Sequence, residues 1–444
     1  EGRLADGVHR RFRVVLPQPH RCGGHGGNHL VRVGGTAESG ELRCVIRSEP
    51  GRVVRHVAHV STGVFQRRDR SRGPGEQFLP QIDRAIKIEQ VRLVSLHVLT
   101  LPSDRPGRAT VGGMIILLAT GGTIASIDAP AGRRVGRGGT ELLAEAAKVW
   151  PLPQRVEVRD TRALVSSALT ATDVHELARH CGRSHPVVIT HGTDAMEETA
   201  FALSLLREPT DPPVVFTGAQ RPFDDPSPDG PRNLAAALAW AGSTEARGTG
   251  VSVVFGDEVL PAIGVRKTHT LSVTGFSAPG RGPFANVDEG GVRRFAVPVL
   301  PATSLTGAAG IAIERVEVLS VQLGITHTIL DALLASDAAL VVEGMGAGNA
   351  PPELTARLVA AIEDGRPVVV TSRTGAGAAV GLYAGGGADL ARAGALFAGD
   401  LSTVQARWAL AAALSHGPVW KTRLNEWLRS AGCVAAAPIA GGKE

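Results

Sequence analysis

Short, continuous apolar runs that end abruptly in polar turns constrain this chain more than any other feature of its sequence. Each run consists mostly of valine, isoleucine and leucine, without the alternation expected of a strand that has one face in water. Such runs are typical of strands buried on both faces, as in parallel sheets covered by helices. They lie at residues 114–119, 186–190, 212–218, 251–256, 338–344 and 367–372.

Helical segments alternate with these runs. Some carry start signals: Glu197 and Glu198 fall in a first turn, where acidic residues are favourable, and Pro351-Pro352 precedes another helix. The expected helices are residues 140–148, 171–180, 195–207, 233–240, 353–364, 403–415 and 422–430. Strands that alternate with helices predict an α/β fold with a mainly parallel sheet and helices on both faces.

The alternation is interrupted once, at residues 298–310, which are rich in Pro, Gly, Ala, Ser and Thr. We therefore predict a larger N-terminal α/β domain at 114–305, a linker at 306–320 and a smaller, Rossmann-like C-terminal α/β domain at 321–435. In sheets of this kind ligands bind outside the carboxyl ends of the strands. The polar turns that follow the apolar runs are therefore the expected place for a functional site.

The first 113 residues show no such pattern. Two candidate strands, 53–60 and 91–101, are separated by runs rich in Arg, Gly and His. This segment has 19 basic and 10 acidic residues, a net charge of +9, whereas the rest of the chain carries −4. Three interpretations stay open: upstream sequence translated from a start placed too early, since Met114 is the first methionine; a disordered basic arm; or a small appended β-rich domain.

Composition excludes several classes of function. Because the basic excess is confined to the first quarter, we predict no nucleic-acid binding. The four cysteines (Cys22, Cys44, Cys181 and Cys433) form no CxxC pair and lie beside no histidine cluster, so neither a zinc site nor a disulfide framework is expected. No apolar run has the length of a membrane span, and no signal peptide is visible. We expect a cytoplasmic protein that has no metal site.

The first motif with chemical potential is TGGTIAS, residues 120–126, which follows the first apolar run. Two glycines allow the backbone to turn sharply and to approach a ligand, and Thr123 comes directly after them. Exposed backbone N–H groups at such a turn can stabilise an oxyanion. Taken alone, the motif fits an ordinary strand–turn as well as a nucleophile site. It is not a phosphate loop, because the spacing GxxxxGK[ST] is absent.

The second motif is THGTDAMEET, residues 190–199, between a strand and a helix. Thr193 can act as a nucleophile or relay a proton, and Asp194 can bind an ammonium group. The structural alternative is that Asp194 caps the helix while Thr193 fills the turn. His191 beside them fits a structural role. Lys267, in GVRKTHT, is a third candidate, since a desolvated lysine can act as a base toward a threonine hydroxyl.

Two further patterns carry no functional prediction. The segment GAGAAVG, residues 375–381, imitates a dinucleotide-binding fingerprint, but its last glycine comes one residue late. The acidic stretch DDPSPD, residues 224–229, contains two prolines and fits a rigid turn better than a cation site, which needs flexible ligands.

Taken together, four motifs resemble one family. LLATGGTIAS, VVITHGTDAMEETAF, VVFTGAQRPFDDPSPDGPRNL and GVRKTHT, in this order and spacing, are similar to bacterial L-asparaginases and glutaminase-asparaginases, from about Met114 to Arg429. The resemblance implies hydrolysis of L-asparagine to L-aspartate and ammonia, with minor activity on glutamine. It also implies a large and a small α/β domain, a homotetramer or homodimer with sites at the subunit interface, and no metal or organic cofactor.

The resemblance implies a catalytic role for four residues. Thr123 matches the family's nucleophile, and Thr193, Asp194 and Lys267 match its Thr–Asp–Lys constellation. Thr123 would attack the side-chain amide, backbone amides would stabilise the oxyanion, and ammonia would leave an acyl-enzyme ester. Water activated near Thr193 and Lys267 would then release aspartate.

Substrate-binding positions follow from the same resemblance. Ser166 matches the position that binds the α-carboxylate, Ser167 would line the same pocket, and Asp194 would hold the α-ammonium group. Asn349, in GMGAGN, matches a residue that a neighbouring subunit adds to the site.

The chain departs from the family pattern in two places. The loop after the first motif, residues 127–139, lacks the tyrosine that usually assists the nucleophile, and the only tyrosine is Tyr383. A glutamate that some members contribute from the neighbouring C-terminal domain has no counterpart in 373–381. Two rival functions therefore stay open: a catalytically silent amino-acid-binding protein, and the amidotransferase subunit that supplies ammonia to tRNA-bound glutamate.

Overall fold

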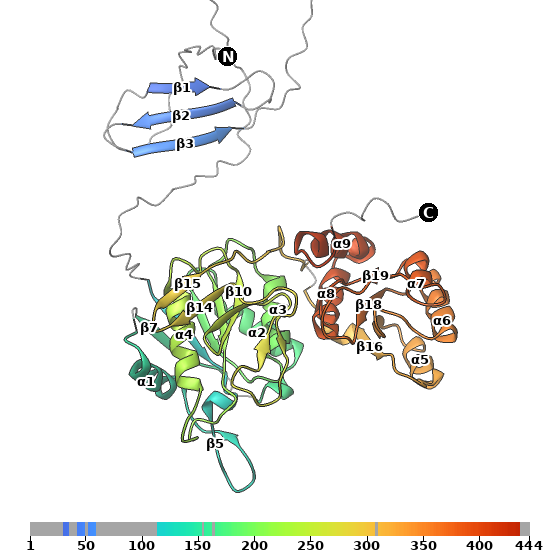
Figure 1. Ribbon diagram of the computed structural model, residues 1–444, viewed down its shortest axis with the longest axis horizontal. Helices are drawn as coiled ribbons and strands as arrows, with labels where there is room; N and C mark the ends of the chain where they lie inside the picture. The colour runs from blue at the N-terminus through green and yellow to red at the C-terminus, as the bar shows by residue number, and fades with distance from the viewer. Residues whose placement is uncertain are drawn as a thin grey trace, which may run out of the picture. The chain divides into compact units, whose positions relative to one another are not determined.

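The computed structural model of the chain describes residues 30–34, 42–48, 52–58, 113–152, 155–161, 165–306 and 310–435. It divides into two units, residues 1–108 and 109–444 (Figure 1). In the first unit, β1 (Leu30–Gly34), β2 (Leu42–Ser48) and β3 (Arg52–Ala58) form an antiparallel sheet in this order. The candidate strand 53–60 overlaps β3, and its last two residues lie outside the described residues, as does the whole candidate strand 91–101.

The second unit contains two α/β domains. The larger domain is built on an eight-stranded sheet of order β15-β14-β11-β10-β9-β8-β4-β7. Its strands are β4 (Ile115–Ala119), β7 (Val156–Asp160), β8 (Val187–Thr190), β9 (Val214–Thr217), β10 (Val251–Phe255), β11 (Glu258–Pro261), β14 (Ala285–Asp288) and β15 (Gly291–Arg294). Strands β7, β4, β8, β9 and β10 are parallel, and β11, β14 and β15 extend the sheet antiparallel.

Helices cover both faces of this sheet, as the uninterrupted apolar runs predict. In β4, Ile116 and Leu118 join the core cluster beneath α2 (Ala171–Cys181) and α3 (Met196–Leu206). Its alternate residues, Ile115 and Leu117, join the opposite cluster beneath α1 (Gly139–Val149) and α4 (Gly230–Gly242). Because successive strand residues point to opposite faces, a strand buried on both sides must be apolar throughout.

The smaller domain has a four-stranded parallel sheet of order β16-β17-β18-β19. Its strands are β16 (Val316–Ser320), β17 (Ala339–Gly344), β18 (Val368–Ser372) and β19 (Leu396–Phe397). Its helices are α5 (His327–Leu334), α6 (Pro352–Glu363), α7 (Gly387–Ala393), α8 (Thr403–Leu414) and α9 (Trp420–Ser430). The predicted α/β fold with a larger mainly parallel domain and a smaller one is confirmed.

One predicted boundary needs correction. Strand β16 lies inside 306–320, the range expected to be a linker, and it pairs with β17 along its whole length. Its sequence VEVLS buries Val316 and Leu319 but exposes Glu317 and Ser320. This edge strand therefore lacks the continuous apolar run by which the central strands were recognised. The smaller sheet begins at Val316.

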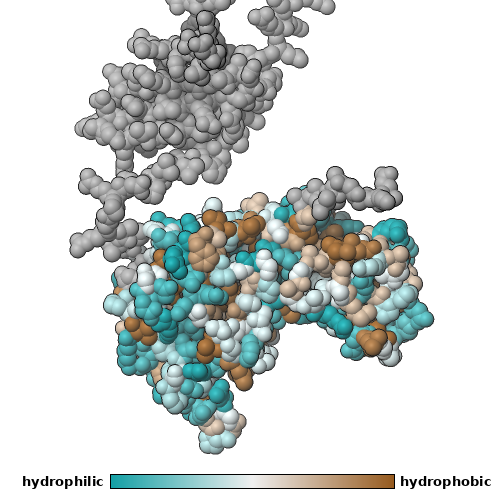
Figure 2. All heavy atoms as spheres, in the orientation of Figure 1, coloured by the Kyte–Doolittle hydropathy of each residue, from teal (hydrophilic) through white to brown (hydrophobic). Residues whose placement is uncertain are grey.

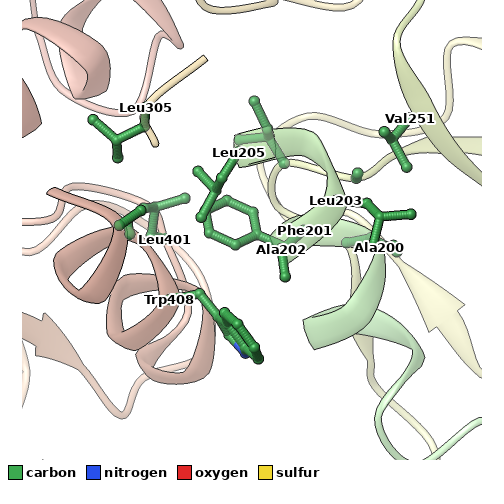
Figure 3. Close-up of a cluster of buried hydrophobic side chains, with 14 of the residues drawn as sticks. Ala200, Phe201, Ala202, Leu203, Leu205, Val251, Leu305, Leu401 and Trp408 are labelled. Carbon is green, nitrogen blue, oxygen red and sulfur yellow. The ribbon is translucent and has the colours of Figure 1, made fainter. Parts of the chain in front are cut away.

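The two domains share one hydrophobic core. Helix α8 packs on β16, β17 and β18 with one side and on α3 with another. Trp408 and Leu401 from the smaller domain face Phe201 and Leu205 of α3 (Figure 3). Phe201 also meets the Trp427 ring edge to face, with ring centroids 5.9 Å apart. A continuous apolar contact of this kind fixes the smaller domain against the helix that follows HGTD.

Strand β5 (Ser126–Ile127) and strand β6 (Arg134–Val135) pair in a hairpin that extends from the larger domain (Figure 1). Residues 130–134 are exposed, and the surface of this projection is mainly hydrophilic (Figure 2). Within the described part of the chain, no helix combines the length and apolar character needed to cross a membrane.

Candidate active site

The loop TGGT lies directly against the loop HGTD. Both follow neighbouring parallel strands, β4 and β8, so they leave the sheet at the same edge. Gly122 has φ +83°, and a Cβ placed on it would lie 2.5 Å from the backbone nitrogen of Gly192. The Thr120 hydroxyl donates to the Thr190 carbonyl at 2.8 Å. Only a glycine allows this close approach, which brings Thr123, at the start of a short 3₁₀ turn (Thr123–Ala125), beside the second motif.

Lys267 joins the second motif through its ammonium group. Its Nζ donates to Thr193 Oγ1 at 2.8 Å and to Asp194 Oδ1 at 2.9 Å. Thr193 is buried, with 4% of its surface exposed, and the Lys267 side chain is 18% exposed. Asp194 is open to solvent, with a 67% exposed side chain. The partly buried ammonium group thus contacts one buried hydroxyl and one accessible carboxylate. The carboxylate of Asp194 is open enough to bind a ligand cation as well.

Lys267 lies on β12 (Arg266–Lys267), a two-residue strand paired with β13 (Phe276–Ser277). This pair is separate from the eight-stranded sheet. The predicted association of Lys267 with the adjacent residues Thr193 and Asp194, which lie 74 and 73 positions before it in sequence, is therefore present in the folded chain.

Ser166 belongs to the same group of loops. It begins a 3₁₀ turn (Ser166–Ala168) and is buried. A Cβ on Gly192 would lie 2.5 Å from Ser166 Oγ, and the backbone N–H of Ala195 donates to that oxygen at 3.4 Å. Ser167 is exposed beside it. Ser166 therefore packs under HGTD, and Ser167 lies at the surface of the same turn.

Asn349 lies in the smaller domain and serves a local contact there. Its Oδ1 accepts the backbone N–H of Gly387 at 3.2 Å, which ties the loop after β17 to the start of α7. Its backbone carbonyl accepts the N–H of Met345 at 2.8 Å. The structure thus gathers Thr123, Ser166 and the Lys267 group in one place, and it gives Asn349 separate contacts.

Known proteins match the chain over both domains. The family model "Asparaginase, N-terminal" matches residues 114–299, and "Glutaminase/Asparaginase C-terminal domain" matches residues 315–426. A probable L-asparaginase of Deinococcus radiodurans is 36% identical over 317 residues, which cover 68% of this chain and 93% of the relative. The chain belongs to the asparaginase family.

Solved structures of asparaginases share this fold. A probable cytoplasmic L-asparaginase from Campylobacter jejuni has a TM-score of 0.62 and 29% identity, over 71% of this chain and 99% of that one. The thermostable L-asparaginase from Thermococcus kodakarensis has a TM-score of 0.64 and 27% identity, over 73% and 100% of the two chains. The family and fold inferred from the four motifs are confirmed.

The chain's tyrosine lies outside the loop where asparaginases of the expected pattern carry one. Tyr383 is in the smaller domain between β18 and α7, and it is 62% exposed. The loop after TGGT instead carries Arg133, which pairs with Asp128 at 3.2 Å, and Asp224 accepts the Asp128 backbone N–H. Ionic and backbone contacts therefore anchor this loop.

His191 has a structural role in the asparaginase chain. Its ring is fully buried, meets Phe216 edge to face, and donates from Nδ1 to the Gly192 carbonyl at 2.7 Å. Burial lowers the pKa of His191 from 6.5 to about 4. The folded protein therefore binds the proton less tightly than the unfolded chain does. The contribution of His191 to the free energy of unfolding is fully present above pH 6.5 and is lost as the pH falls from 6.5 toward 4.

We expect the free energy of unfolding to fall by about 3 kcal/mol through this group between pH 7 and pH 4. His191→Asn keeps a donor near Nδ1 but cannot take up the proton, so its unfolding free energy should depend less steeply on pH. Urea titrations of both proteins at several pH values measure the difference. Equal slopes between pH 6.5 and 4 would contradict this role for His191.

Two contacts at the site were not predicted from the sequence. Glu197 accepts the backbone N–H of Lys267, and Gln405 of α8 holds the segment that leads into β12. From the sequence, Glu197 was expected only to favour the start of a helix, and no pattern indicated a role for Gln405. Both contacts join residues at least 70 positions apart.

Proposed function

We propose that the chain hydrolyses L-asparagine to L-aspartate and ammonia through an ester on Thr123, with minor activity on L-glutamine. The observation that carries this proposal is the Lys267 ammonium group, which contacts Thr193 and Asp194 beside the TGGT turn. The family to which the chain belongs supports the same chemistry.

In the first half of the reaction, Thr123 Oγ attacks the side-chain amide carbon of asparagine. Backbone N–H groups of the glycine-containing loops stabilise the oxyanion. The threonine proton is transferred to the departing nitrogen, the carbon–nitrogen bond breaks, and ammonia leaves an aspartyl ester.

In the second half, water held near Thr193 and Lys267 attacks the ester. One water proton returns to Thr123 Oγ, and the hydroxide adds to the acyl carbon, so that aspartate is released. Lys267 shares its proton with the Thr193 hydroxyl and thereby assists each transfer.

The substrate backbone is held by opposite charges and hydroxyl donors. Asp194 binds the α-ammonium group, for which its exposed carboxylate is suited. Ser166 and Ser167 bind the α-carboxylate from the adjacent turn. Neither a metal nor an organic cofactor takes part in this scheme. Among described residues, no group of three or more His, Cys, Asp or Glu side chains is arranged to hold a metal ion.

We propose further that copies of the chain associate as homodimers or homotetramers, in which Asn349 of a neighbouring subunit completes each site. We place the enzyme in the cytoplasm, in line with its likeness to the Campylobacter jejuni protein. No membrane or nucleic-acid partner enters the proposal.

Ammonia release from L-asparagine and L-glutamine by the full chain tests the proposed activity. We expect turnover of asparagine to exceed that of glutamine, and Lys267→Met to lower kcat by about 100-fold, because proton transfer loses its assisting group. Lys148→Met is the control, since Lys148 is exposed and pairs with Glu145 at the surface. Saturable aspartate binding without ammonia release would instead indicate an amino-acid-binding protein.

A further inference from the structure

The backbone of Lys267 is held by very little sheet structure. Strand β12 has two residues and a single partner strand, also of two residues. Two paired residues give few interstrand hydrogen bonds, so this ribbon alone is a weak support for a side chain that must meet Thr193 within a fraction of an ångström.

A carboxylate supplies a further support. Glu197, in the first turn of α3, accepts the backbone N–H of Lys267 with Oε2 at 2.5 Å. The Nζ of the same lysine reaches Thr193 and Asp194, just before that helix. The segment 193–197 therefore contacts both the main chain and the ammonium group of Lys267. The distance between these two contacts determines where Nζ lies.

Glu197 is also an electrostatic counterpart to two cations. Burial raises the pKa of Glu197, and the negative charge of Glu198 raises it further. The hydrogen bond from the Lys267 N–H and the positive charges of Arg266 and Lys267 lower it. Arg266 is itself partly buried, and it reaches into the smaller domain, where its Nη2 donates to the Asp400 carbonyl at 3.2 Å. A carboxylate enclosed beside two consecutive cations stabilises the backbone that carries both.

We propose that Glu197 is a positioning residue for catalysis: it fixes the backbone of Lys267 so that the ammonium group meets Thr193. This inference rests on the proposed function, in which Lys267 assists proton transfer. Among the described residues, the Glu197 carboxylate bonds to the backbone of Lys267 and makes no hydrogen bond to Thr123, so its effect on the reaction should pass through Lys267.

The neighbouring Glu198 provides a matched control. It lies in the same helical turn with similar partial burial, but its Oε2 accepts the indole N–H of Trp408 in α8 at 3.1 Å. Removal of Glu198 therefore perturbs the contact between domains, whereas removal of Glu197 perturbs Lys267.

Steady-state kinetics on the full chain give the first test. Glu197→Ala should lower kcat for asparagine by about tenfold with little change in KM, because the charged hydrogen bond that places Lys267 is lost. Glu197→Gln keeps an acceptor oxygen for the same N–H and should stay within about threefold of the parent protein. Glu198→Ala should stay within about twofold, since the hydrogen bond that it removes joins α3 to Trp408 of α8.

A double-mutant cycle separates positioning from a merely structural role. In a Lys267→Met background, Glu197→Ala should change kcat by less than about twofold, because no ammonium group is left to position. An undiminished tenfold loss in that background would overturn the proposal, as would equal losses for Glu197→Ala and Glu198→Ala.

A second readout does not depend on turnover. The chain has only five lysines, so with ¹⁵N-labelled lysine the Nζ signal of Lys267 can be assigned by its absence from Lys267→Met. We expect this hydrogen-bonded signal in the parent protein, in Glu197→Gln and in Glu198→Ala, and its loss or displacement in Glu197→Ala. An unchanged Lys267 signal in folded Glu197→Ala would overturn the positioning role. Absence of ammonia release by the parent protein would refute the proposed function instead.

Discussion

Thr123→Ala is expected to lower kcat for asparagine by about 10⁴-fold or more while the fold persists, because removal of a covalent nucleophile leaves only binding and oxyanion stabilisation. Thr123 is partly exposed at the end of a tight turn, and its loss removes no core packing. The free energy of unfolding should therefore change by less than about 0.5 kcal/mol. Ammonia release and urea unfolding of the same preparation measure both quantities.

Thr123→Ser is the matched control, since it retains the hydroxyl oxygen and removes only a methyl group. It should keep measurable turnover, well above that of Thr123→Ala. If Thr123→Ala releases ammonia within about tenfold of the parent rate, a different group performs the attack and the assignment of Thr123 fails.

Gly122→Ala should damage catalysis strongly, although Gly122 has no reacting side chain. Its Cβ would lie 2.5 Å from the nitrogen and 2.6 Å from the Cα of Gly192, neither of which can rotate away. The loops TGGT and HGTD must then separate, which moves Thr123 relative to Thr193. We expect kcat to fall by at least about 100-fold, as misplacement of about 1 Å does, and the unfolding free energy to fall by about 3 kcal/mol.

Gly280→Ala separates this clash from backbone strain. Gly280 has φ +82°, nearly the value at Gly122, but among the described residues nothing other than its chain neighbours lies within 4 Å of the position of its Cβ. It should lose about 1 kcal/mol of stability from the left-handed conformation and keep its activity. Similar kinetic losses in the two variants would show that strain, and not contact between the loops, determines activity.

The sequence predicted the central strands because burial on both faces leaves an unmistakable apolar run. Strands at the edges and in the antiparallel extension were missed for the opposite reason. In β15, GVRR, three of the four residues are exposed, so nothing distinguishes this strand from a loop. Helix α7 was missed as well, since it is short and follows consecutive glycines. Such elements are specified by tertiary pairing rather than by their own composition.

The candidate site was predictable as a set of motifs and as the association of Lys267 with Thr193 and Asp194, but the contacts between its loops were not predictable. Thr193, Asp194 and Lys267 were each ambiguous alone, and their order and spacing resembled one family. The contact between Gly122 and Gly192 could not be derived, because it depends on how two loops leave adjacent strands. The bond from the Lys267 backbone to Glu197 was equally hidden, since a glutamate at a helix start has an adequate local explanation.

Mass spectrometry of the protein quenched in acid during turnover of L-asparagine identifies the residue that carries the acyl group. Thr193→Val is the preferred protein, because slowed hydrolysis allows the ester to accumulate. We expect one aspartyl group, carried by the peptide that contains Thr123. An aspartyl group on another residue would contradict this expectation, as would continued ammonia release with no covalent intermediate on Thr123.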